Sequence, residues 1–136
     1  MTNQDQKKLA QFWLDGSVAD MAAAKQLILI GKLYPQGLFF LHLSIEKILK
    51  YAYILKFGTH APFTHNLLHL LDRCEFLSSD SIKEKLAVIN EFNLTTRYPD
   101  QNTLAKKKFN ATFSKKYLLL GLGIHKWLLK ESKSTQ

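Results

Sequence analysis

The segment Thr96-Arg97-Tyr98-Pro99-Asp100 places three polar, chemically capable side chains around a proline. Pro99 fixes its own φ angle and disfavours the helical region for Tyr98, so the chain has to turn here. Loops that a rigid scaffold holds in place often carry binding groups. Arg97, Tyr98 and Asp100 are therefore candidate site residues. The alternative is that Arg97 and Asp100 only cap and pin the helices on either side.

A second group of chemically capable residues has helical spacing. Glu46 precedes Lys50 by four residues and follows His42 by four, so the three share one helix face. Such a face would suit acid–base chemistry. The alternative, which the spacing alone favours, is an ion pair at a surface or interface. Such exposed pairs contribute roughly a few tenths of a kcal/mol to stability.

Two histidines four residues apart, His65 and His69, would share a face of the following short helix, near Asp72 and Cys74. Paired histidines at this spacing bind metal ions in some proteins. No third ligand follows at a recognised spacing, so we expect no metal site. The favoured alternative is that His65 makes one hydrogen bond to a neighbouring element.

These residues have to be positioned by helices. Glycine and proline are scarce, with 6 and 3 residues, and apolar residues recur every three or four positions. The pattern predicts an all-α protein, with the whole chain, residues 1–136, as one domain. The expected fold is an up-and-down bundle of about five helices, over residues 3–30, 35–57, 65–74, 81–92 and 103–130.

Each predicted helix has a candidate cap. Thr2 with Asp5, and Ser81 with Glu84, have the spacing of a capping box. We expect Thr64 to cap the third helix and Asp100 or Asn102 to cap the last one, while Gly31 and Gly58 end the first two. The predicted inner face of the last helix consists of Leu104, Phe109, Phe113, Tyr117, Leu120, Ile124 and Trp127.

The basic residues are unevenly distributed. Residues 1–100 carry 11 basic and 10 acidic side chains, whereas residues 101–136 carry 8 lysines and one glutamate. A basic helix attracts nucleotides, nucleic acid or an acidic partner, although it can also be only a solvated face. The single cysteine, Cys74, and the polar N-terminal residues predict a cytoplasmic protein. The longest apolar run, residues 117–124, is too short to span a membrane.

The last helix is apolar on nearly every side between Leu118 and Leu129. A helix of this kind has to be buried on every side. In so small a domain, a second subunit would cover the outer face most easily, and Gly121 and Gly123 would permit close approach. The sequence therefore predicts a homodimer through the apolar C-terminal helix.

Four sequence features together resemble the HEPN domain, the higher eukaryote and prokaryote nucleotide-binding domain. They are Trp13 with Ala19-Asp20 and Gly31-Lys32-Leu33-Tyr34, then Phe39 followed by Glu46-Lys47-x-x-Lys50, then Thr64-His65-Asn66-Leu67, and finally Thr96 to Asp100. The resemblance implies a dimeric helical bundle that binds an ATP-like or GTP-like nucleotide or RNA. It also implies a neighbouring nucleotidyltransferase as partner. The site residues it implies are Glu46, Lys47, Lys50, His65, Arg97, Tyr98 and Asp100.

One departure from the family bears on catalysis. Many HEPN ribonucleases carry an arginine followed four to six residues later by a histidine, and neither Arg97 nor Arg73 has one. Without this histidine, RNA cleavage lacks its expected proton carrier. We therefore expect no catalytic residue and no cofactor, and favour a non-catalytic nucleotide-binding or interaction module. The alternatives are a metal-independent ribonuclease toxin that uses His65 and Arg97, and an antitoxin-like partner of a nucleotidyltransferase.

Overall fold

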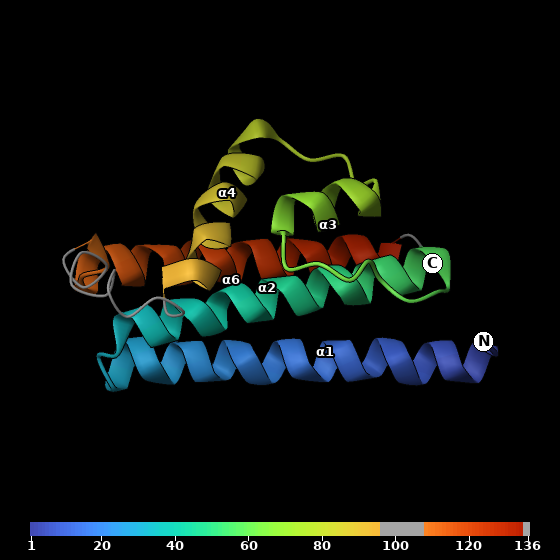
Figure 1. The fold of residues 1–136 in the computed structure, drawn as a ribbon, viewed down its shortest axis with the longest axis horizontal. Helices are drawn as coiled ribbons and strands as arrows, with labels where there is room; N and C mark the ends of the chain where they lie inside the picture. Colours follow the sequence, from blue (N-terminus) through green and yellow to red (C-terminus); the bar gives the residue numbers. More distant parts are fainter. Residues whose placement is uncertain (96–107, 135–136) are drawn as a thin grey trace.

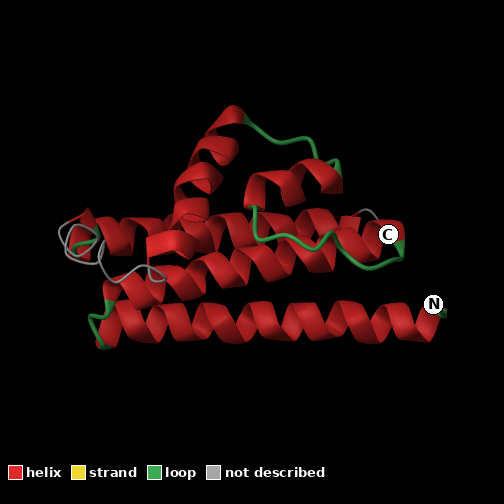
Figure 2. Cartoon of the chain, viewed as in Figure 1, coloured by secondary structure: helices red, strands yellow, loops and turns green. Residues whose placement is uncertain are grey.

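The computed structural model describes residues 1–95 and 108–134. Within these ranges the chain is helical and contains no strand, which confirms the all-α prediction (Figure 2). The helices are α1 (Asn3–Lys25), α2 (Tyr34–Phe57), α3 (Leu67–Cys74), α4 (Asp80–Thr95) and α6 (Ala111–Ser134), with a π-helical turn, η1 (Gln26–Ile30), at the end of α1. None of the described helices is both long and apolar enough to cross a membrane.

The bundle is organised around α2. Helices α1 and α6 lie along it, and the shorter α3 and α4 pack on one side (Figure 1). Most residues of α2 are buried, including Leu38, Leu41, Ile45, Ile48 and Leu49. Because α2 is covered from several sides, a polar side chain on it is buried even where its spacing resembles that of a surface pair.

The helix ends agree with the sequence in part. Thr2 and Asp5 form the predicted capping box, and Gly58 ends α2 with a left-handed φ of 68°. The first helix ends as predicted at Ile30 with Gly31 as its cap, but the left-handed residue there is Lys32, with a φ of 54°. The first predicted helix therefore ends in a π-helical turn, which is followed by a lysine with a positive φ angle.

Two predicted caps are wrong, and a third lies outside the described residues. The side chain of Asn66, not Thr64, accepts the first backbone N–H groups of α3. The hydroxyl of Ser79, not Ser81, accepts from the backbone N–H of Ile82 at the start of α4. The predicted caps of the last helix, Asp100 and Asn102, lie outside the described residues. The described helix α6 begins at Ala111, and the side chain of Asn110 caps it by accepting from the backbone N–H of Phe113. For α3 and α4, a residue two positions away with similar capping chemistry takes the position.

The inner face of α6 also differs from the prediction. Its fully buried residues are Ser114, Leu118, Gly121, Ile124, Leu128 and Ser132. Tyr117, Leu120 and Trp127 are only half-buried, and Leu104 lies outside the described residues. The prediction followed the largest side chains, whereas α6 turns its small residues toward α2, and a Cβ added to Gly121 would lie 2.5 Å from Cδ1 of Leu41.

Candidate functional site

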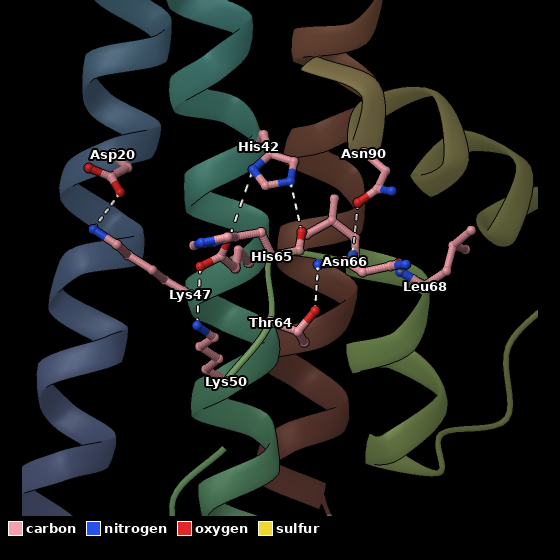
Figure 3. A network of polar contacts seen from close by, with 11 residues as sticks. Asp20, His42, Lys47, Lys50, Thr64, His65, Asn66, Leu68 and Asn90 are labelled. Carbon is pink, nitrogen blue, oxygen red and sulfur yellow. Dashed lines mark hydrogen bonds and ion pairs between the residues drawn. The ribbon is translucent and has the colours of Figure 1, made fainter. Parts of the chain in front are cut away.

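A buried carboxylate on α2 holds an imidazole that reaches the surface. Oε1 of Glu46 lies 2.9 Å from Nδ1 of His65, which stands in the segment between α2 and α3 (Figure 3). The side chain of Glu46 is 5% exposed and that of His65 is 54% exposed. A carboxylate accepts a hydrogen bond, so Nδ1 carries the proton in this pair. The contacts among the described residues thus leave Nε2 of His65 for an external partner.

Lys50 lies on the other side of the same carboxylate. Its Nζ donates to Oε2 of Glu46 over 3.2 Å and lies 4.9 Å from the ring centre of Trp13 on α1. Both side chains of the ion pair are buried, so the prediction of a surface or interface pair is wrong. Burial between α1, α2 and the segment leading into α3 explains the difference. Lys50 neutralises Glu46 and is not free to contact a ligand as the structure stands.

His42 anchors the backbone beside His65. This fully buried imidazole donates from Nε2 to the carbonyl oxygen of His65 over 3.1 Å, and its Nδ1 lies 3.9 Å from Glu46 (Figure 3). Burial lowers the pKa of His42, against the opposing effect of the Glu46 carboxylate. A neutral His42 with its proton on Nε2 satisfies this carbonyl, so His42 positions His65 and needs no charge to do so.

The backbone two residues after His65 is also held by a side chain. The backbone N–H of Leu67 donates to the side-chain oxygen of Asn90 on α4, over 2.9 Å. Sequence reasoning missed Asn90, although an asparagine at helical spacing with Leu86 could have indicated a polar contact inside the bundle. His65 is consequently held by side chains from two helices, α2 and α4.

Lys47 belongs to a different contact. Its Nζ lies 2.7 Å from Oδ2 of Asp20 on α1 (Figure 3). A Cβ at Gly16 would lie 3.1 Å from Cδ of Lys47, so this glycine leaves room for the lysine to cross α1. The structure therefore brings Glu46, Lys50 and His65 together and directs Lys47 toward α1.

The remaining candidates cannot be placed in this arrangement. Arg97, Tyr98 and Asp100 lie outside the described residues. Among the residues that are described, no group of three or more histidine, cysteine or acidic side chains is arranged to hold a metal ion. His65 makes the hydrogen bond to a neighbouring element that the sequence favoured over metal binding.

A second polar cluster, which sequence reasoning missed, joins α1, α2 and α6. The Ser17 hydroxyl donates to the Ser44 carbonyl and the Ser44 hydroxyl donates to the Ser17 carbonyl, each over 2.8 Å. Nε2 of His125 lies 2.7 Å from the Ser17 hydroxyl. Because the Ser17 proton is used for Ser44, the histidine has to donate. Burial, and then Lys25, lower the pKa of His125. This cluster cross-links the bundle.

The sequence model of the HEPN domain matches residues 10–125, which is most of the chain. No match was found among curated proteins or among solved structures. The matched range contains α1, α2, α3 and α4 apart from the first turns of α1, and with them Glu46, Lys50 and His65. The match associates the chain with nucleotide-related or RNA-related function. On this match, and in agreement with its all-α bundle, the chain belongs to the HEPN domain family.

Proposed function

We propose that this protein is a non-catalytic nucleotide-binding or interaction module of the HEPN type that acts together with a nucleotidyltransferase. The observation that carries the proposal is the Glu46–His65 pair, a half-exposed imidazole whose orientation is set by a buried carboxylate. A side chain fixed in this way gives up little rotational entropy when it binds a ligand. In the neutral ring its free nitrogen would accept a hydrogen bond from a ribose hydroxyl, and in the imidazolium the same nitrogen would donate to a phosphate oxygen.

The basic surface supports an anionic ligand. Lys115, Lys116, Lys126 and Lys130 are exposed along α6. A run of lysines raises the local concentration of phosphate-bearing molecules. Lys47 would contribute only if the ligand competes with Asp20 for its ammonium group. Lys50 and Glu46 act as positioning residues.

The turn residues complete the proposal. Arg97 would offer a planar, bidentate fork to phosphate oxygens, Tyr98 would stack on a base, and Asp100 would orient Arg97 or cap a helix. These roles follow from the family resemblance and the residue types. They define a second half of the site, to be tested independently of His65.

Homodimer formation through α6 is part of the proposal. Leu119 is largely exposed, and a Cβ at Gly123 would meet no atom within 4 Å. Together with Ile82, Lys85, Leu120, Ile124 and Trp127, these residues border an open hollow of about 320 Å³ between α4 and α6. Leu119 and Gly123 are one helical turn apart, so the leucine of one subunit would fit over the glycine of the other across a two-fold axis. Light scattering of Leu119→Glu should then report a monomer.

A second candidate is supported by the same pair. A carboxylate that orients an imidazole is an arrangement used in general acid–base catalysis. His65 would then carry protons in RNA cleavage, as in a metal-independent ribonuclease toxin. RNA cleavage without added metal that His65→Ala abolishes would establish this alternative, whereas binding without cleavage would support the non-catalytic module.

The proposal is tested first by thermal-shift measurements with ATP, GTP and dinucleotides on wild type, His65→Ala and Arg97→Ala. We expect stabilisation of the wild type by at least one nucleotide, because binding to the folded state alone raises its stability. The shift should shrink in His65→Ala. Absence of a shift with every nucleotide and with short RNA would overturn the nucleotide proposal. Pull-down of a minimal nucleotidyltransferase by the tagged protein tests the partner.

A further inference from the structure

The segment between α2 and α3 presents a fully exposed phenylalanine, Phe63, two residues before His65. The backbone N–H of Thr64 donates to the carbonyl oxygen of Pro62 over 3.0 Å, so a tight three-residue turn is centred on Phe63. A turn of this kind points its central side chain outward. Phe63 makes no ring contact with another described aromatic residue at the distances that Phe12–Trp13 or Phe76–Trp127 show.

Hydrogen bonds hold the segment between α2 and α3 at His65 and at the residues on either side of it. Upstream, the Thr64 hydroxyl accepts from the backbone N–H of Asn66 over 3.1 Å. At His65 itself, the carbonyl is held by His42 and the imidazole by Glu46. Phe63 is therefore displayed by a fixed backbone, and an exposed aromatic ring on a fixed backbone is prepared for a partner with little loss of entropy on binding.

The chemistry around Phe63 favours a nucleobase over an apolar protein surface. Residues 58–66 read Gly-Thr-His-Ala-Pro-Phe-Thr-His-Asn, with no acidic residue and no aliphatic side chain larger than alanine or proline. A protein-docking patch is a contiguous apolar area, whereas here one aromatic ring stands among hydrogen-bonding side chains. A flat ring beside polar groups is the arrangement with which proteins stack unpaired bases.

The spacing of Phe63 and His65 fits a single nucleotide. Two residues span at most about 7 Å of extended backbone. One nucleotide carries its base at one end and its ribose and phosphate oxygens at the other. With the base on Phe63, these oxygens would lie within reach of Nε2 of His65, the ring nitrogen that Glu46 leaves free.

We infer that Phe63 is a stacking platform for an unpaired nucleobase whose ribose or phosphate is bound by His65. The ligand class is a nucleotide, either free or within single-stranded RNA. This inference rests on the proposed function, because it adds the base-binding half to the His65 site. It needs neither the turn at Arg97 nor the α6 surface.

The test measures equilibrium binding of a nucleic-acid probe to the chain of residues 1–136, with fluorescence anisotropy as the readout. The probes are a labelled single-stranded adenylate octamer, an abasic octamer of equal charge, and unlabelled ATP as competitor. The variants are Phe63→Ala, Phe63→Trp and Leu77→Ala. Leu77 is the matched control, since it is also fully exposed and lies in a loop, between α3 and α4. Light scattering of each variant records the oligomeric state.

Phe63→Ala should weaken octamer binding roughly 5- to 150-fold, the range expected for loss of one base–aromatic stack. Phe63→Trp should restore binding, and Leu77→Ala should leave it unchanged. The abasic octamer should bind Phe63→Ala and wild type alike. If ATP displaces the octamer, a free nucleotide is sufficient to occupy the site. If ATP does not displace it, the ligand is single-stranded RNA.

Two results would overturn the inference while leaving the proposed function intact. The first is equal octamer binding by wild type and Phe63→Ala when His65→Ala weakens it. The second is conversion of a dimer to a monomer by Phe63→Ala, which would make Phe63 a subunit contact. If wild type binds neither octamer nor ATP, the proposed function itself fails and the inference fails with it.

Discussion

Glu46 and His65 form a hydrogen bond of 2.9 Å between a side chain that the bundle buries and one that solvent reaches. The carboxylate also accepts from Lys50, so its charge is balanced within the protein before any ligand arrives. The pair connects the stability of the bundle to the geometry of the proposed site. Substitutions at Glu46 should therefore affect both.

Glu46→Ala should lower the free energy of unfolding by about 3–5 kcal/mol, because it leaves the buried ammonium of Lys50 without its partner. Urea unfolding measures the change. Lys47→Ala is the comparison, since it removes a more exposed ion pair with Asp20, and its cost should be smaller than that of Glu46→Ala. Equal stability of Glu46→Ala and wild type would mean that Lys50 reaches solvent.

Two glycines on α6 should respond in opposite directions to alanine. At Gly121 the new methyl would clash with Leu41, and overpacking of this kind costs about 1–3 kcal/mol. At Gly123 the methyl meets no atom of its own subunit, so in the monomeric Leu119→Glu background the higher helix propensity of alanine should stabilise by up to about 1 kcal/mol. Thermal denaturation of the two variants compares them directly. Destabilisation by Gly123→Ala in the Leu119→Glu background would contradict this prediction, whereas destabilisation in the wild-type background alone would indicate that the proposed dimer covers Gly123.

Stability should fall as the pH drops below about 6.5. Burial lowers the pKa of His42 and of His125 in the folded protein below 6.5, so between that value and the lowered ones the unfolded chain binds more protons. The stabilising contribution is complete above the unfolded pKa and is lost as the pH falls through the folded one. Urea midpoints at pH 7.5 and 5.5 test this, and His125→Gln should reduce the difference. A higher midpoint at pH 5.5 in the wild type would contradict it.

The thiol of Cys74 should be unreactive in the folded protein. Burial raises its pKa to about 12, although Lys56 acts in the opposite direction, and its Sγ contacts the carbonyl of Leu49 over 3.4 Å. The thiolate is the reactive form, so a disulfide reagent at pH 8 should modify Cys74 only after unfolding. The reaction is followed with and without denaturant. Rapid stoichiometric modification of the native protein would show that α3 opens readily.

The sequence predicted where the helices lie better than it predicted which face of each helix packs against another helix. Helical periodicity placed α2, and α1 together with its π-helical end η1, within a residue or two, since Thr2, Pro35 and Gly58 mark helix ends by local chemistry. The inner face of α6 was misjudged because large side chains were taken as the core, whereas small residues such as Ser114 and Gly121 are buried there and Gly121 lets α6 approach Leu41 on α2. Which face is buried depends on neighbours that periodicity does not identify.

The polar cluster around Glu46 was predicted in its members but not in its arrangement. Glu46, Lys50 and His65 were all candidates, yet spacing could relate Glu46 only to residues on its own helix. The contact with His65 spans 19 residues and a loop, and it depends on His42 and Asn90 holding the backbone. Lys47 was grouped with these residues because the family resemblance implies it, while the fold pairs it with Asp20.

The central claim, that a nucleotide or RNA is bound through the imidazole of His65, is tested most directly by nuclear magnetic resonance of the histidine side chains. ATP and a short single-stranded RNA are titrated into the wild type, with His60 and His69, both exposed, as internal controls. We predict saturable shifts of the His65 ring signals with at least one ligand, and small shifts for the controls. Unchanged His65 signals at ligand concentrations that saturate binding would contradict the claim, as would the absence of any binding.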